Sequence, residues 1–128
     1  MKKNFLLVDD ESVSNFVHRK LIERTGLGEN IDTVTSGQDA LQLINDCYSG
    51  TRPMPDVIFL DLNMPIMDGY SFLEAFNRLP IPIKKNMKVI IVTSSQDPRD
   101  KARAKEYGIT HFLSKPISEE AINRVWEG

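Results

Sequence analysis

The stretch that decides the fold is Phe5–Asp10, with the sequence FLLVDD, in which four apolar residues run directly into two carboxylates. The run is apolar at every position rather than at alternate positions, which is typical of a parallel strand buried on both faces. Two similar runs follow, Val57–Leu60 and Val89–Val92. They also end at polar residues, Asp61 and Thr93. We interpret the three runs as the central strands of a parallel sheet.

Helical patterns separate these runs and two weaker strands, which we expect at the sheet edges over Ile31–Thr35 and Ile109–Leu113. Ser36, Asp97 and Ser118 are predicted N-caps, and Gly26 is placed to end the first helix. The apolar helix faces are expected at Val13, Phe16, Val17 and Leu21; at Leu41, Ile44 and Cys47; at Phe72, Leu73 and Phe76; and at Ile122, Val125 and Trp126.

The fourth predicted helix, which begins with Asp97-Pro98, is crowded with charges and has little to bury. Its apolar side is hardly more than Ala102 and Tyr107, so we expect it to be held loosely. The alternation of strands and helices predicts an α/β fold, a (βα)5 doubly wound parallel sheet of the flavodoxin-like kind with strand order 2-1-3-4-5.

The gross numbers favour one compact domain over residues 1–128, with 41% hydrophobic content and a formal net charge of -2. This charge gives no reason to expect nucleic acid or a membrane as a partner. The single cysteine, Cys47, fits a reducing compartment, and the apolar run behind Met1 is too short for a signal peptide. We expect a cytoplasmic protein.

Polar groups from distant segments are predicted to meet at one edge of this sheet. Asp9 and Asp10 follow the first strand, Asp61 the third, Thr93 the fourth and Lys115 the fifth. Because the ends of parallel strands share one edge, where ligands of open α/β sheets bind, these groups are expected in one small volume.

The mixture of groups indicates phosphoryl chemistry. Three carboxylates at close range repel each other, and a hard divalent cation such as Mg²⁺ relieves that repulsion. Asp61 stands alone at the end of a central strand, so it is the best nucleophile toward phosphorus, and Asp9 and Asp10 then serve the metal. Lys115 and the cation would neutralise charge on the phosphoryl oxygens, and Thr93 could donate a hydrogen bond to one of them.

Four segments together resemble the receiver domains of bacterial response regulators, including the single-domain type of the chemotaxis regulator. They are Leu6–Glu11, Asp61–Gly69, Thr93-Ser94 and Phe112–Pro116. The likeness covers essentially the whole chain. It implies two-component signalling, in which the domain catalyses only its own phosphorylation and dephosphorylation.

The resemblance also implies residue roles. Asp61 accepts phosphate from a histidine kinase or a phosphotransfer protein. Mg²⁺, or Mn²⁺ in its place, is bound directly by Asp10 and Asp61 and by the backbone carbonyl of Asn63, and mainly through water by Asp9. Lys115 contacts the phosphoryl group.

The remaining implied roles concern output. Thr93 and Phe112 form a switch pair, and the Lys115–Pro116 peptide bond is expected to be cis. The loosely held fourth helix is expected to respond, which places the surface for an unknown output protein on the fourth helix, the fifth strand and the fifth helix.

Three alternatives compete with this interpretation. A flavin nucleotide binder needs a phosphate loop rich in N–H donors, whereas Asp9-Asp10-Glu11 would repel a phosphate. A phosphohydrolase that turns over through an aspartyl phosphate needs an acid at position 63, which is Asn. The third alternative is that the sequence is a receiver domain cut from a longer regulator, and it stays open beside the interpretation as a stand-alone receiver. His18 is expected on a solvated helix face rather than as a phosphohistidine.

Overall fold

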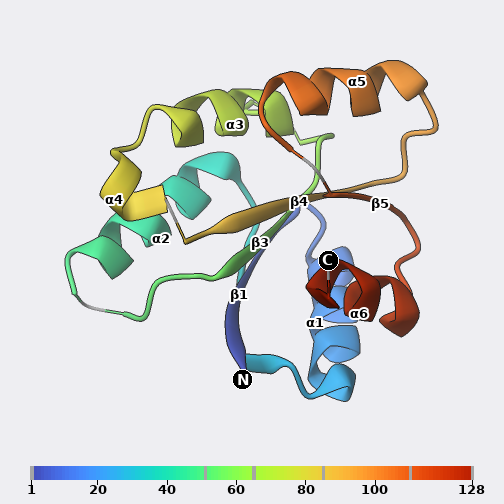
Figure 1. Ribbon diagram of the computed structural model, residues 1–128, viewed down its shortest axis with the longest axis horizontal. Helices are drawn as coiled ribbons and strands as arrows, with labels where there is room; N and C mark the ends of the chain where they lie inside the picture. Colours follow the sequence, from blue (N-terminus) through green and yellow to red (C-terminus); the bar gives the residue numbers. More distant parts are fainter. Residues whose placement is uncertain (1, 51, 65, 85, 110, 128) are drawn as a thin grey trace.

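A parallel β-sheet runs through the middle of the computed structural model, which describes residues 2–50, 52–64, 66–84, 86–109 and 111–127 (Figure 1). Its strands are β1 (Lys3–Val8), β2 (Gly28–Val34), β3 (Val57–Leu60), β4 (Lys88–Thr93) and β5 (His111–Ser114). They form one sheet in the order β2-β1-β3-β4-β5, with every pair parallel. The predicted topology and the two edge strands are therefore confirmed, although the prediction for Thr110 lies outside the described residues.

Helices cover both faces of the sheet. Their bounds are α1 (Ser12–Thr25), α2 (Gly37–Tyr48), α3 (Gly69–Asn77), α4 (Ile81–Lys84), α5 (Pro98–Glu106) and α6 (Glu119–Glu127). In Figure 1, α1 and α6 lie together on one side, and α2, α3 and α5 lie on the other. The short α4 was not predicted from the sequence. None of the helices within the described residues is long and apolar enough to cross a membrane.

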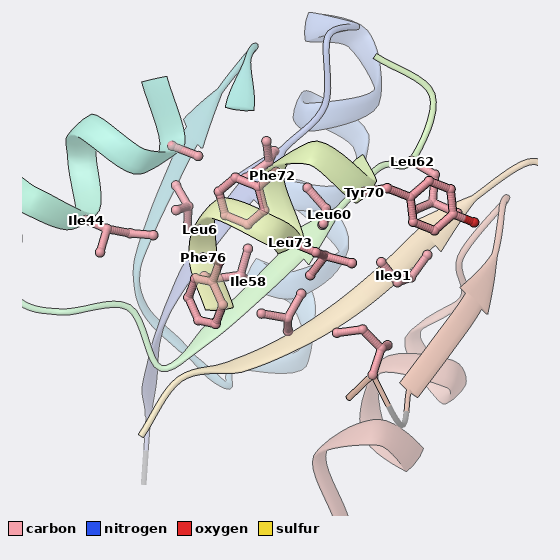
Figure 2. Close-up of a cluster of buried hydrophobic side chains, with 14 of the residues drawn as sticks. Leu6, Ile44, Ile58, Leu60, Leu62, Tyr70, Phe72, Leu73, Phe76 and Ile91 are labelled. Carbon is pink, nitrogen blue, oxygen red and sulfur yellow. The ribbon is translucent and has the colours of Figure 1, made fainter. Parts of the chain in front are cut away.

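The strands supply side chains to two separate cores. Leu6, Ile58 and Ile91 face α2 and α3, where they pack among Ile44, Phe72, Leu73 and Phe76 (Figure 2). Their neighbours Phe5, Phe59 and Ile90 point the other way, toward Ile22 of α1 and Ile122 of α6. Burial on both faces explains why the central runs are apolar at every position.

The helix ends follow the predicted chemistry. Ser36, Asp97 and Ser118 each accept a backbone N–H with the side chain, from Asp39, Arg99 and Ala121. Gly26 ends α1 in the left-handed conformation, at a φ of 73°. Cys47 is buried in the α2 core, as expected. The inward positions predicted for Val125 and Trp126 concern side chains outside the described part of the structure.

The predicted apolar face of α1 is wrong at Val13, Phe16 and Val17, whereas Leu21 is partly buried against the core as predicted. Val13, Phe16 and Val17 are 73%, 60% and 47% exposed, while Asn15, His18 and Ile22 are buried. The helix is turned in this way because the Asn15 amide satisfies two backbone carbonyls at the ends of β1 and β2. Hydrophobicity alone therefore selected the wrong stripe, and the predicted solvated position of His18 is wrong for the same reason.

The weak burial expected of α5 is confirmed, but through a different residue. Ala104 is the buried side chain of this helix, whereas Ala102 is exposed. One small buried methyl group contributes little hydrophobic stabilisation. Polar contacts must therefore account for much of the placement of α5.

We expect two phenylalanine truncations to differ sharply in stability. Phe72 is fully buried, so Phe72→Ala should lower the free energy of unfolding by about 3–5 kcal/mol. Phe16 is exposed and lies near the Lys20 ammonium, so Phe16→Ala should cost less than about 1 kcal/mol. Urea unfolding of both variants measures the difference, and a large loss in Phe16→Ala would contradict the orientation of α1.

A carboxylate cluster at the carboxyl edge of the sheet

Three carboxylates meet at the edge where β1 and β3 end. Carboxylate oxygens of Asp9, Asp10 and Asp61 all lie within 4.8 Å of one another. The ladder hydrogen bonds continue past the strands, since Asp9 N donates to Val34 O at 3.2 Å and Asp61 N donates to Val8 O at 3.0 Å. The backbone therefore delivers these residues to the same edge, as the sequence predicted.

Lys115 lies inside this cluster. Its Nζ is 2.7 Å from Asp9 Oδ2 and 3.8 Å from Asp61 Oδ2. Lys115 N donates to Thr93 O at 2.8 Å, and the Lys115–Pro116 peptide bond is cis. One ammonium therefore faces two buried carboxylates, which leaves the cluster with an excess of negative charge.

The two aspartates after β1 have different surroundings. Asp9 is buried, and its oxygens accept hydrogen bonds from Glu11 N and Lys115 Nζ. Asp10 is exposed. Since Asp9 already has a partner at each oxygen, Asp10 is better placed to give an oxygen to a cation.

The shortage of positive charge acts most strongly on Asp61. Burial, followed by repulsion from Asp9, raises the pKa of Asp61 from 3.8 to about 6, although Lys115 and the Asn63 N–H oppose the change. A divalent cation bound beside Asp61 would lower this pKa again. The cluster therefore combines a destabilised carboxylate with a group of oxygens suited to a hard metal.

Thr93 and Asn63 connect Asp61 to the loop after β4. Thr93 is fully buried, and its Oγ1 accepts hydrogen bonds from Ser95 N at 3.1 Å and Asn63 Nδ2 at 3.4 Å. Asn63 N lies 3.4 Å from Asp61 Oδ1. The sequence predicted a role for the Asn63 backbone carbonyl, and it did not predict this side-chain contact with Thr93.

Phe112 lies on the neighbouring strand. It is opposite Ile91 in the ladder, and Ser114 is opposite Thr93. Its ring is partly buried against the core on the α2 and α3 side. Phe112 thus lies near Thr93 on the side of the sheet that carries α5.

Asn15 is a residue of the site that sequence reasoning missed. It is 3% exposed, and its Nδ2 donates to Asp9 O at 3.1 Å and to Val34 O at 3.0 Å. Within the described residues, its buried Oδ1 has no hydrogen-bond partner. Its amide fixes the start of the acidic loop against β2, and nothing in the local spacing distinguishes it from a surface asparagine.

Gly69 brings α3 close to Asp61. A Cβ at this position would lie 2.7 Å from Leu62 Cα and 2.9 Å from Asp61 O, which no side chain can accept without a backbone shift. Gly69 N also donates to Leu62 O at 2.9 Å. The first turn of α3 is therefore joined closely to the end of β3.

Comparison with known proteins agrees with this arrangement. The family model described as the response regulator receiver domain matches residues 5–126. A two-component response regulator from Cytophaga hutchinsonii is 33% identical, with a TM-score of 0.89 over 99% of this chain and 96% of that one.

Longer relatives match as well. Two-component response regulator 24 of Arabidopsis thaliana is 31% identical over 91% of this chain and 76% of its own length. The sensor histidine kinase CheAY of Helicobacter pylori is 32% identical over 94% of this chain, which spans 14% of that kinase. The chain therefore belongs to the response regulator receiver family, the phosphoacceptor domains of two-component systems.

The raised pKa of Asp61 predicts a pH-dependent cost to folding. The unfolded carboxyl ionises near 3.8 and the folded one near 6, so the folded state binds the extra proton between these values. In metal-free protein, stability should therefore fall as the pH rises through this window. Asp61→Asn, which cannot ionise, should match the wild type below the window and exceed it by about 2–3 kcal/mol above it.

Urea unfolding with a chelator at a series of pH values measures this difference. Added Mg²⁺ should stabilise the wild type more than Asp61→Asn at pH 7. A difference between the two proteins that does not change with pH would contradict the raised pKa.

Proposed function

We propose that Asp61 is the phosphoacceptor of this receiver domain and that it takes the phosphoryl group from a phosphohistidine. The observation that carries this proposal is a buried carboxylate at the end of β3, beside two further carboxylates and Lys115. An Asp61 carboxylate oxygen forms the new bond to phosphorus. The bond between the histidine nitrogen and phosphorus breaks, and the imidazole leaves with its electron pair.

The residues of the cluster fit a divalent cation, and we assign Mg²⁺, with Mn²⁺ as a substitute. Three carboxylates with oxygens within 4.8 Å of one another are typical of a hard-metal site. Asp10, Asp61 and the Asn63 backbone carbonyl would hold the ion directly, and Asp9 would act mainly through water. When bound, the cation neutralises charge on the phosphoryl oxygens.

Lys115 and Thr93 complete the site. The Lys115 ammonium, near both Asp9 and Asp61, offers a positive charge to a phosphoryl oxygen. Among the described residues, the Thr93 hydroxyl accepts both of its hydrogen bonds, so its proton can be donated to another phosphoryl oxygen. Donation would turn this hydroxyl toward Asp61, and the Phe112 ring would follow it as the second member of the switch pair.

The exposed side of α1 suits the phosphodonor, a histidine kinase or a histidine phosphotransfer protein. Val13, Phe16 and Val17 are large exposed apolar residues of α1, the helix that follows Asp9 and Asp10. A hollow of about 290 Å³ between α1 and the loop after β5 is lined by Val13, Ser14, Val17, His18, Lys115 and Pro116. Lys115 lines this hollow and lies 3.8 Å from Asp61, so an apolar helix of the donor is the occupant that we propose for it.

The output surface is proposed to lie on the elements that follow Thr93, namely α5, β5 and α6. The helices α5 and α6 are the fourth and fifth helices predicted from the sequence, because the short α4 was not predicted. The output protein is unknown. We further propose a single receiver domain over residues 1–128 that acts in the cytoplasm and turns over no external substrate. Neither nucleic acid nor a membrane is proposed as a partner, because the formal net charge is only -2.

Phosphorylation by a small donor tests the acceptor assignment. Wild type incubated with acetyl phosphate and Mg²⁺ or Mn²⁺ should gain one phosphoryl group in an intact mass spectrum. Asp61→Asn keeps the shape of the side chain but lacks the nucleophile, so its mass should stay constant. The wild type with a chelator is the matched control, and equal labelling of the two proteins would reject Asp61.

Metal titration separates the two aspartates after β1. Asp10 is exposed, whereas Asp9 is engaged by Glu11 N and Lys115. Asp10→Asn should therefore weaken Mg²⁺ binding, measured by calorimetry, more than Asp9→Asn does. The reverse order would show that Asp9 is the direct ligand.

A further inference from the structure

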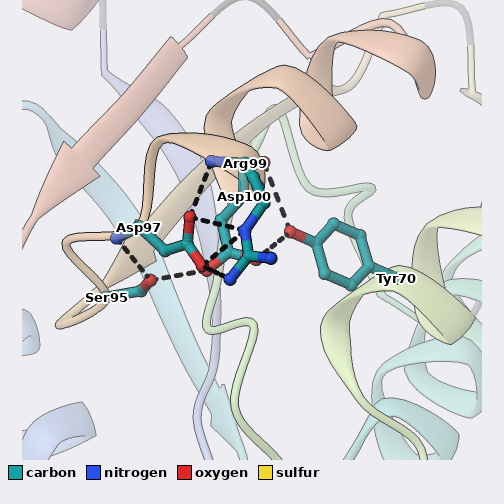
Figure 3. A network of polar contacts seen from close by, with 5 residues as sticks. All are labelled: Tyr70, Ser95, Asp97, Arg99 and Asp100. Atoms are coloured by element: carbon teal, nitrogen blue, oxygen red, sulfur yellow. Dashed lines mark hydrogen bonds and ion pairs between the residues drawn. The ribbon is translucent and has the colours of Figure 1, made fainter.

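Asp100 of α5 joins two segments that approach it from different sides (Figure 3). One is the loop after β4, where the Ser95 hydroxyl donates to Asp100 Oδ2. The other is α3, where the Tyr70 hydroxyl donates to Asp100 Oδ1 at 2.7 Å and lies 3.2 Å from Asp100 O. A single carboxylate therefore ties the first turn of α5 both to α3 and to the loop.

Tyr70 is a rigid anchor for this connection. It is 6% exposed, and it follows Gly69, whose backbone is closely packed against Leu62 and Asp61. The Tyr70 ring stacks on Tyr107 with centroids 5.9 Å apart, and the Arg103 guanidinium lies 3.8 Å from its centroid. Ring and backbone are thus fixed, and the hydroxyl is held at one place over α5.

The same carboxylate is linked to Thr93 through Ser95. Ser95 N donates to Thr93 Oγ1 at 3.1 Å, and Ser95 Oγ also accepts from Asp97 N at the cap of α5. If Thr93 turns its hydroxyl toward a phosphoryl group, it loses the Ser95 N–H. The loop must then shift, which strains the contact of Ser95 with Asp100 or moves α5 away from Tyr70.

Burial opposes such a movement of α5 only weakly, and its other contacts with α3 include those of Arg103 and Tyr107 with the Tyr70 ring. Ala104 is its buried side chain, and most of its other side chains are exposed. The hydrogen bonds that the Asp100 carboxylate accepts from Tyr70 and Ser95 therefore contribute much to the position of this helix. Burial, and then Asp100, raise the pKa of Tyr70, so the hydroxyl stays protonated and remains a donor.

We propose that Tyr70 is a positioning residue. Its hydroxyl, through Asp100 and Ser95, stabilises the β4–α5 loop in the conformation of the unphosphorylated domain relative to the conformation that it takes when Asp61 is phosphorylated. This inference rests on the proposed function of Asp61. Its consequence is that Tyr70 sets how strongly the domain resists activation. Removal of the hydroxyl lowers that resistance, and the affinity for a phosphoryl group at Asp61 rises.

Beryllofluoride binding with Mg²⁺, measured by calorimetry, tests the proposal on the full chain. Tyr70→Phe removes one oxygen and keeps the ring with its neighbours Tyr107 and Arg103. It should bind beryllofluoride about three- to tenfold more tightly than the wild type, because one net hydrogen bond no longer opposes the bound state. Amide exchange over residues 98–106 should also be faster in the free variant.

Tyr107→Phe is the matched control. It removes a hydroxyl from the ring that stacks on Tyr70, and that hydroxyl takes no part in the hydrogen bonds from Tyr70 through Asp100 to Ser95. It should leave both measurements unchanged. A Tyr70→Phe variant with unchanged or weaker beryllofluoride affinity, or with unchanged exchange in α5, would overturn the proposal. Loss of folding stability alone would not reproduce a tighter affinity, and urea unfolding of both variants measures that loss separately.

The test also separates this inference from the proposed function. If beryllofluoride with Mg²⁺ fails to bind the wild type, the assignment of Asp61 fails. If it binds the wild type and Tyr70→Phe equally, only the role of Tyr70 is rejected.

Discussion

The rest of the structure depends on mutual repulsion among three carboxylates held at one edge of a buried sheet. Asp9 and Asp61 are almost without solvent, and Lys115 supplies one positive charge between them. The backbone leaves them no freedom to separate, because each lies one residue beyond a strand whose ladder continues through it. The fold therefore maintains a local excess of negative charge, which a bound divalent cation would relieve.

The sheet and the composition of the cluster could be predicted because both follow from short local patterns. An apolar run such as Phe5–Val8 identifies a doubly buried strand without knowledge of its neighbours. Parallel topology then assigns every strand end to the same edge, so Asp9, Asp61 and Thr93 converge whatever the details of the helices are. Caps such as Asp97 were predictable for the same reason, since a cap depends on a few adjacent residues.

The errors arose where a side chain's place is decided by partners far away in the chain. On α1, hydrophobicity favoured Phe16 over Asn15, but two carbonyls at the ends of β1 and β2 needed the Asn15 amide. His18 was turned inward with it. The link from Tyr70 to Asp100 spans 30 positions, so no local pattern indicates it. Such contacts depend on how elements pack, which periodicity does not specify.

The lone thiol of Cys47 has a practical consequence for following motion in this molecule. It is 4% exposed, and burial raises the pKa of the thiol, so little of it is present as reactive thiolate. A cysteine introduced on the exposed side of α5 would therefore react with a maleimide dye far faster than the native one. Fluorescent or spin labels could be attached there without first removing Cys47, and the core around α2 would remain intact.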